Sequence, residues 1–298
     1  MNKKDAQKTE TRLIVFLDIL GFKDILGKNN EGLDFLLDIL REMRKFQQKF
    51  SVKIDEFKDG RKIKISSDLS AYSDHLIISI PIDEIPIEIL TPWSLVGEEL
   101  YIMQQMQKRN IALRCVYKLI TYAYTLALSK GVALRGAISI GHIYYNEDER
   151  IFLGESLVEA INDEAKKAIY PRVIISDSLL RHFIDYPSDY NPSLNFMFTE
   201  QESMMSKKEP VLPYFIIKDH VDNHYYINWF HNILKDRKFI LEHFSMLSSI
   251  RDKISENINS TNHKADVLSK WRWLASCFNK NLMKWNEFNP LDKIEKSC

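Results

Sequence analysis

The chain has 298 residues, of which 45% are hydrophobic and 28% are charged. This length and composition fit one large domain or two modest ones with a sizeable core. The 41 Lys and Arg residues balance the 41 Asp and Glu residues, so no global cationic field favours nucleic acid or anionic lipid as a partner. The three cysteines lack CxxC spacing, which argues against a disulfide framework and a zinc site.

The first residues, up to Arg12, are polar and charged and lack the apolar region of a secretion signal. No uninterrupted apolar run approaches the roughly 18 residues that span a bilayer. We therefore expect a reduced, cytoplasmic protein that binds neither nucleic acid nor membrane.

The pattern of apolar residues over about 13–80 predicts one strand, then a helix, then two further strands. Residues 13–17 are an apolar run typical of a buried strand, and Asp18 follows them directly. Apolar residues at helical spacing predict a helix over 31–50 with a charged opposite face. Residues 62–70 and 72–80 predict two strands of a hairpin, although no Asn-Gly or Asp-Gly turn joins them.

The middle of the chain predicts two further helices and two further strands. A long helix is expected over 95–129, and Gly131 is placed to end it. Residues 132–143 are typical of a strand, 154–169 of a helix, and 172–176 of another strand. This order indicates an α+β fold, a βαββαβ palm-like domain with an addition, in which helices cover one face of an antiparallel-containing sheet.

The chain changes character near residue 180, where we place a domain boundary. Residues 1–180 are expected to form the palm-like domain, and 181–298 a mostly helical C-terminal extension. In the extension the pattern predicts a short β segment and then two amphipathic helices: 212–217 with 225–229, followed by 233–258 and 264–285.

Two acidic residues stand at the edges of two predicted strands. Asp18 follows the first strand, and Asp74 lies inside the hairpin segment. Carboxylates are preferred ligands of hard divalent cations, and two such cations can bind a nucleoside triphosphate and drive an in-line attack on phosphorus. An Asp after a strand is also a common turn or helix cap, so the interpretation depends on the two acids occurring together with further motifs.

Four segments within about residues 12–180 carry the motifs that support this interpretation, and they occur in the order expected for one protein family. The segments are Phe16–Phe22, Tyr72–Asp74, Leu134–Gly141 and Gly154–Ala160. Together they resemble the catalytic domain of class III nucleotide cyclases. The closest resemblance is to the bacterial pyrimidine cyclases of the Pycsar antiphage system, because of Ser73 before Asp74, the Leu-Arg-Gly-Ala-Ile-Ser strand and the Tyr-Pro-Arg segment that ends at Arg172.

The resemblance implies a reaction and a set of partners. The protein would convert UTP, or CTP, into its 3′,5′-cyclic monophosphate and pyrophosphate, with two Mg²⁺ or Mn²⁺ ions in each active site. It would act as a homodimer with active sites at the subunit interface, and its product would act on a separate effector during phage infection. An ATP or GTP cyclase, and a cyclase-fold protein that binds nucleotide without turnover, are the alternatives.

The resemblance also assigns roles to the residues around the first acid. Asp18 and Asp74 would bridge the two ions, and the carbonyl of Ile19 would add a ligand to one. The backbone amides that follow would hold phosphate oxygens, with the glycine permitting close approach: Leu20, Gly21 and Phe22.

The predicted helix over 154–169 departs from the adenylyl and guanylyl cyclases. Their Asn and Arg, four residues apart, act on ribose and on the transition-state phosphate, whereas this chain has Val158 and Asn162. Lys166 lies one turn further and is expected to share a face with both. It would supply positive charge to the triphosphate, or it is an ordinary solvated lysine.

Two arginines are further candidates for binding phosphate. Arg135 lies within an apolar strand, where an arginine needs a partner or faces a cleft, so a catalytic role and a structural salt bridge are both open. Arg172 follows Pro171 at the start of a strand and would either reach a phosphate or cap the sheet.

The base pocket also differs from that of the purine cyclases. Their base-reading Lys lies four residues before the second metal ligand, where this chain has Ser70, which is compatible with a smaller base. Tyr72 would stack on a pyrimidine or pack into the core. We interpret His75 as structural and Trp273 as a helix-packing residue.

Overall fold

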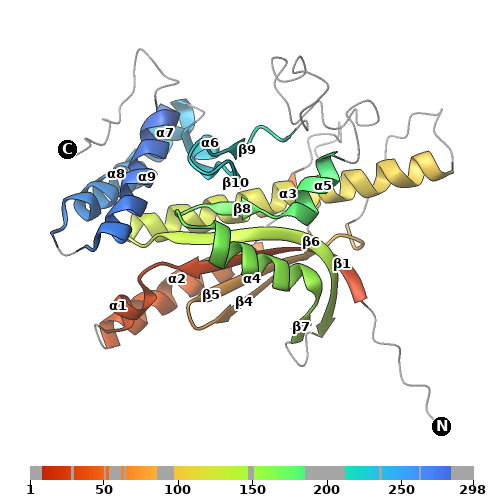
Figure 1. Cartoon of the computed structure of the whole chain (residues 1–298), viewed down its shortest axis with the longest axis horizontal. Helices are drawn as coiled ribbons and strands as arrows, with labels where there is room; N and C mark the ends of the chain where they lie inside the picture. The colour runs from red at the N-terminus through yellow and green to blue at the C-terminus, as the bar shows by residue number, and fades with distance from the viewer. Residues whose placement is uncertain are drawn as a thin grey trace, which may run out of the picture.

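The computed structural model describes residues 9–27, 30–49, 52–53, 62–63, 65–85, 97–146, 151–184, 212–234, 237–261 and 263–282. Within them, one mixed sheet is packed against helices, and further helices follow at the C-terminal end (Figure 1). This confirms the predicted α+β class and the helical C-terminal part.

The centre of the sheet is formed by β1 (Thr9–Ile19) and β6 (Leu134–Asn146). β1 pairs antiparallel with β6 on one side and with β5 (His75–Pro81) on the other, and β4 (Asp68–Tyr72) pairs with β5 at the edge. Every residue of β1 from Arg12 to Ile19 is buried, so both faces of the central strand are covered.

Beyond β6 the sheet continues through segments from both sides of residue 180. β8 (Val173–Ile175) pairs parallel with β6, β10 (Tyr225–Ile227) pairs with β8, and β9 (Ile216–Lys218) pairs with β10. The short β7 (Ile151–Leu153) pairs with the far end of β6. The division into two domains stays a prediction, but the sheet that holds β1 is shared by both parts.

One face of the sheet packs against α2 (Asn30–Lys49) and α3 (Glu98–Ser129), which lie behind the sheet in Figure 1. Leu13, Val15 and Leu17 of β1 belong to the same core cluster as the buried side chains of these helices. Gly131, with φ of 77°, follows the end of α3 and so ends it as predicted.

Part of α3 has the length and hydropathy of a membrane-spanning helix. Charged residues interrupt Gln107–Ser129, which is why the sequence shows no uninterrupted apolar run. In the structure, 78% of its apolar window is buried within the protein. Its buried side chains line the large core cluster, which explains the apolar composition.

The other face of the sheet carries α4 (Glu155–Lys167), which corrects the prediction that helices cover one face alone. Ala160 of α4 packs against Ile14 and Phe16 of β1 in a second cluster. The helix lies close to β6, because a Cβ added to Gly141 would meet the Cβ of Ser156 at 3.2 Å. The second cover is required because β1 is apolar on both of its faces.

Two predicted elements differ from the structure in their boundaries. Lys62–Ile63 forms β3, which pairs with β2 (Val52–Lys53) in a separate two-stranded sheet, so the strand predicted over 62–70 is wrong. Only β4, from Asp68 onward, joins β5, and the turn between them is the dipeptide Ser73-Asp74. Ser73 supplies the positive φ, 54°, that Asn or Gly ordinarily supplies in a tight hairpin.

The C-terminal helices pack against α3 and one another. The helix predicted over 233–258 is divided at His243, where α7 ends and α8 begins. The helices of this part are α6 (Trp229–Leu234), α7 (Arg237–Glu242), α8 (Phe244–Asn259) and α9 (Ala265–Leu282). The shorter α1 (Phe22–Leu26) and α5 (Asp177–Ile184) lie elsewhere along the chain.

Candidate active site

A row of four polar residues crosses the sheet at one end of β1. Tyr72 lies opposite His75, His75 opposite Asp18, and Asp18 opposite Arg135. Directly paired residues of antiparallel strands place their side chains on the same face. Phe16, two residues before Asp18, packs beneath α4, so the row lies on the face that α4 covers.

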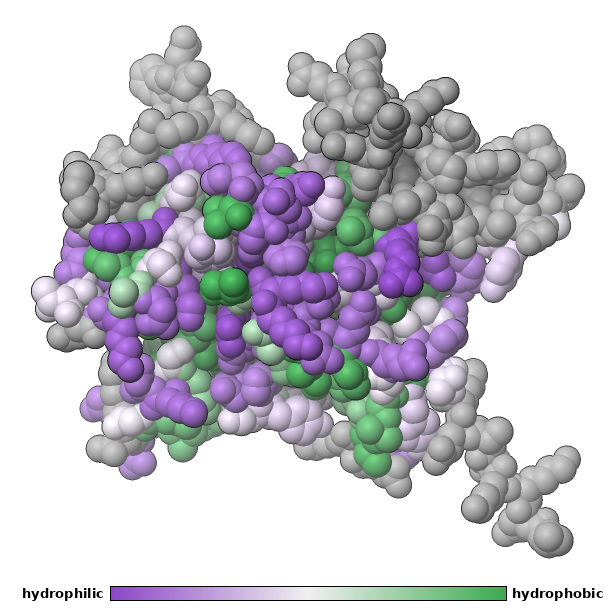
Figure 2. Space-filling model, in the orientation of Figure 1, coloured by the Kyte–Doolittle hydropathy of each residue, from purple (hydrophilic) through white to green (hydrophobic). Residues whose placement is uncertain are grey.

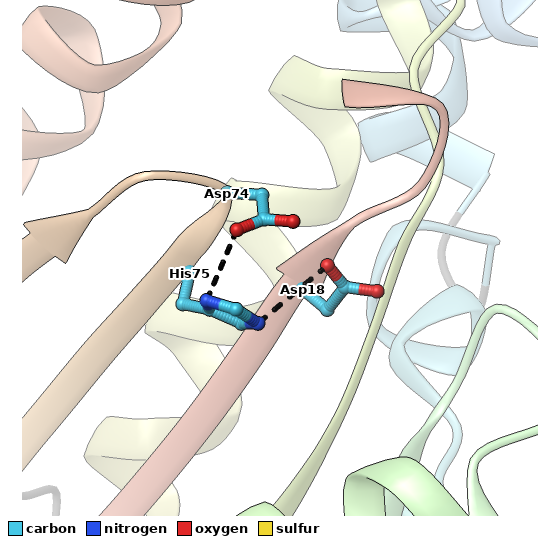
Figure 3. A group of neighbouring side chains, drawn as sticks. All are labelled: Asp18, Asp74 and His75. Atoms are coloured by element: carbon cyan, nitrogen blue, oxygen red, sulfur yellow. Dashed lines mark ion pairs between the residues drawn. The ribbon is translucent and has the colours of Figure 1, made fainter. Parts of the chain in front are cut away.

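The turn between β4 and β5 brings the second acid to this row (Figure 3). Asp74 lies in the turn, and its carbonyl accepts a 2.9 Å hydrogen bond from the Ile19 amide, which ties the turn to β1. The His75 ring lies between the two carboxylates, with Nδ1 3.1 Å from Asp74 and Nε2 4.0 Å from Asp18. The ring also stacks on Phe16 at 4.8 Å, which fixes its orientation.

Asp18, Asp74 and His75 form a donor set suited to a divalent cation. One ligand atom from each lies within 4.8 Å of the others. The two carboxylates suit Mg²⁺ and Mn²⁺, and the imidazole suits Mn²⁺ better than Mg²⁺. The residues present therefore fit such an ion. His75, which we interpreted as structural, lies in this candidate donor set because the register sets it opposite Asp18.

Arg135 connects this cluster to α4. Its Nε donates a 2.8 Å hydrogen bond to Oδ2 of Asp18 and lies 2.8 Å from Oε1 of Glu164. Burial raises the pKa of the Glu164 carboxyl, and the nearby Arg135 charge opposes that shift. Glu164 was not among the residues predicted from the sequence. Its spacing of four residues from the buried Ala160 was the available signal, since that spacing puts both on one face of the helix.

The loop after β1 is held in place by its own backbone. Gly21 has φ of 80°, a left-handed conformation that favours glycine, and it precedes α1. The Leu20 amide donates to the Ala133 carbonyl at 2.9 Å, so in this conformation it is not available to a phosphate. The Ile19 side chain is buried, and Phe22 begins α1.

The residues predicted for the base lie beside the acids. Ser70 and Tyr72 are two residues apart on β4, so their side chains share the face of the polar row. Tyr72 is exposed, which removes the alternative that it packs into the core. Ser70 is half-buried.

Two residues predicted on α4 lie away from the acids of the same chain. Asn162 and Lys166 are exposed on the outer side of the helix, together with Val158, and these three share a face as expected. Glu164 is on the buried side and approaches Arg135. The structure therefore does not bring Asn162 or Lys166 to Asp18 within one chain.

Arg172 is fully buried in a different cluster. Its guanidinium pairs with both Asp219 and Asp222, and the Trp273 indole donates to Asp219 at 3.0 Å. The rings of Tyr170, Tyr226 and Trp273 lie 5.4–5.8 Å from it. Of the two predicted roles, the structure places Arg172 as a brace of the sheet rather than in reach of a phosphate. Trp273, which was predicted only to pack a helix, also donates a hydrogen bond to this cluster.

No family model and no curated protein matches the sequence. Among solved structures, the chain is similar to the guanylyl cyclase domain of the RhoGC fusion protein from the aquatic fungus Blastocladiella emersonii, a bacterial light-regulated adenylyl cyclase, and a class III adenylyl cyclase-like ATP-binding protein from Pseudomonas aeruginosa. The identities are 13%, 12% and 13%, and the TM-scores 0.33, 0.34 and 0.30.

These similarities cover 59%, 60% and 65% of this chain, respectively. They cover 86% of the fungal domain but only 46% and 37% of the two bacterial proteins. At such low TM-scores they carry no weight for function, so the proposal that follows depends on the geometry of the site and on the sequence motifs.

Proposed function

We propose that this chain is a nucleotide cyclase that converts UTP, or CTP, into the 3′,5′-cyclic monophosphate and pyrophosphate. The observation that carries the proposal is the meeting of Asp18, Asp74 and Arg135 at one end of the sheet, with ligand atoms close enough to share a cation. A triphosphate carries several negatively charged oxygens. Cations held by the two acids, together with the arginine beside them, would offset that charge.

Asp18 and Asp74 would hold two Mg²⁺ or Mn²⁺ ions, with the Ile19 carbonyl as an additional ligand. When bound, these ions offset the charge of the phosphate oxygens and lower the pKa of the ribose 3′-hydroxyl. His75 offers an imidazole nitrogen between the two acids. The protein would hold these ligand atoms in a fixed arrangement, and the backbone hydrogen bond from Ile19 to Asp74 supports this.

Arg135 is a cation that this chain can direct at the triphosphate from within the same subunit. It borders the acids, and its side chain is 25% exposed, so it can reach a ligand that Arg172 cannot reach. The amides of Gly21 and Phe22 are the phosphate donors left in the loop once Leu20 is committed to Ala133. Arg135 therefore takes the transition-state role that a helix arginine has in the purine cyclases.

Ser70 and Tyr72 support a pyrimidine over a purine. A serine in place of the long lysine of the purine cyclases is compatible with a smaller base. Tyr72 presents an exposed ring on the same face as Asp18, where it can stack on a base. UTP is the first candidate and CTP the second.

The outer side of α4 supports a homodimer. Val158, Ile161 and Ile169 are 57%, 40% and 53% exposed, and Figure 2 shows separate hydrophobic spots on the otherwise hydrophilic face of the molecule that carries α4. A second copy that covers this side would bury these side chains. It would also receive Asn162 and Lys166, which do not reach the acids of their own chain.

The biological role rests on the resemblance to the Pycsar cyclases. We place the protein in the cytoplasm, where it would make its cyclic nucleotide upon phage infection. The product would then bind a separate effector that kills or arrests the cell.

The test is to incubate the purified protein with Mn²⁺ and ATP, GTP, CTP or UTP separately and to identify the products by mass. A cyclic pyrimidine nucleotide that is lost in Asp18→Asn and retained in the surface control Asp252→Asn supports the proposal. A cyclic purine would keep the reaction and refute the pyrimidine. Mn²⁺-dependent nucleotide binding without any product would favour the inactive alternative.

A further inference from the structure

Glu164 of α4 is a buried acid whose position the predicted roles do not explain. Its side chain is 6% exposed, and among the described residues its Oε1 receives no hydrogen bond. The Arg135 Nε–H lies 2.8 Å away but donates to Asp18. A buried carboxylate oxygen left without a hydrogen bond costs free energy, and the Arg135 Nε–H lies close enough to satisfy this one in a second arrangement.

The second arrangement follows from charge. Arg135 holds Oδ2 of Asp18, and Oδ1 faces His75, so a divalent cation bound by Asp18 would share the carboxylate with the guanidinium and repel it. Glu164 is the neighbouring carboxylate within reach of the same Nε, so Arg135 can turn to it without leaving the site. Without Glu164, the guanidinium would have Asp18 as its one acidic partner and would compete with the metal for it.

We infer that Glu164 is a positioning residue, an inference that rests on the proposed metal site. When a cation binds Asp18, Glu164 would accept the hydrogen bond of the Arg135 Nε–H and so lower the free-energy cost of metal binding. It acts through Arg135 and does not itself contact the cation. In the same arrangement it keeps Arg135 beside the triphosphate. Partners of metal ligands commonly change metal affinity by about 10–100-fold when they are removed.

The neighbouring Asp163 supplies a matched control. It is also a buried acid of α4, and one of its oxygens likewise receives no hydrogen bond among the described residues, but its ion-pair partner is Lys167, 2.8 Å away and one turn along the same helix, rather than Arg135. Replacing either acid by its amide removes one charge and hardly changes the shape of the side chain. Only the replacement of Glu164 removes a partner of Arg135.

The experiment measures Mn²⁺ affinity of the full chain without nucleotide, by titration calorimetry or by the electron paramagnetic resonance of free Mn²⁺. We expect Glu164→Gln to weaken Mn²⁺ binding about tenfold and Asp163→Asn to change it less than about twofold. Glu164→Asp keeps the charge but withdraws the carboxylate by one methylene, and we expect it to weaken binding about fivefold. In an Arg135→Gln background, Glu164→Gln should change the affinity less than about twofold, because the residue through which it acts is gone.

Two results would overturn the inference about Glu164 but leave the proposed metal site intact. One is an unchanged Mn²⁺ affinity in folded Glu164→Gln or, where that variant does not fold, in Glu164→Asp. The other is an equal loss with and without Arg135, which would mean that Glu164 contributes only its charge. If the wild type shows no Mn²⁺ binding that depends on Asp18, the proposed metal site fails and the inference fails with it.

Discussion

Arg135 and Arg172 lie beside each other in the sheet, since the Gly136 amide donates to the Arg172 carbonyl, yet their surroundings differ. Arg172 is fully buried, has one acid for each terminal nitrogen and is surrounded by three aromatic rings. Arg135 is partly exposed, and its Nε–H donates to Asp18 while lying 2.8 Å from the second acid, Glu164. Each terminal nitrogen of Arg172 has an acid of its own, although its Nε has no hydrogen bond among the described residues, whereas two acids lie within reach of the single Arg135 Nε–H, which can therefore change partner.

The largest effect is expected when the paired arginine is removed. Arg172→Met leaves the buried Asp219 without its cation, and breaking a buried ion pair costs about 3–5 kcal/mol of unfolding free energy. Chemical denaturation monitored by tryptophan fluorescence measures the loss. Arg135→Met is the control and should cost under about 2 kcal/mol, because its site is partly open to water. Equal losses would remove the distinction between the two clusters.

The second effect concerns turnover rather than stability. Asp18→Asn and Asp74→Asn should each lower cyclic nucleotide formation at least about 100-fold, because even the outer partners of metal ligands matter by 10–100-fold. Stability should change little, since each substitution removes one negative charge from a cluster of acids. The measurement is the initial rate at saturating Mn²⁺, with Asp252→Asn as the surface control. Full activity in either variant would refute the metal assignment.

The third effect tests the aromatic side of the Arg172 cluster. Trp273→Phe retains an aromatic ring but removes the indole N–H that donates to Asp219 at 3.0 Å. A hydrogen bond to a charged group contributes about 1.5–3 kcal/mol, so we expect a loss of stability near the lower end. Activity well below the unfolding temperature should stay unchanged. A drop in activity at unchanged stability would show that the C-terminal helices affect the site directly.

Much of the site could be predicted from the sequence because strand ends are local features. Asp18 follows an apolar run, and Asp74 lies in the predicted hairpin, so the order of the two acids along the chain was enough to propose that they meet; that Asp74 occupies the turn rather than a strand is a finding of the structure. The partners of the arginines could not be predicted in the same way. Glu164 reaches Arg135 from a helix laid across the sheet, and Asp219 reaches Arg172 from 47 residues away.

The same limit explains the errors in the fold. Apolar spacing predicted one helix over 233–258, since spacing records which residues are buried and not where the helix axis turns; the structure divides it at His243. The strand predicted over 62–70 was wrong because pairing partners decide which residues join a sheet. The position of His75 beside the two acids was not foreseen for a similar reason: it depends on the register with β1.

The smallest effect is a pH dependence of stability at Glu164. Burial raises the pKa of this carboxyl in the folded protein, so between its ordinary value and the raised one the folded state binds more protons than the unfolded state. The stability that Glu164 contributes therefore falls as pH rises through this window. Below about pH 4 the acid is neutral in both states, and Glu164→Gln should match the wild type in stability.

As pH rises toward 8, Glu164→Gln should become more stable relative to the wild type, because it has no charge to bury. Urea denaturation of both proteins without metal between pH 4 and 8 measures this difference. Arg135 opposes the shift, so in an Arg135→Gln background the gain from Glu164→Gln should be larger. A gain that instead shrinks as pH rises would mean that the attraction of Arg135 outweighs burial. The Arg135 cluster would then be paired as firmly as that of Arg172, and the contrast between them would be lost.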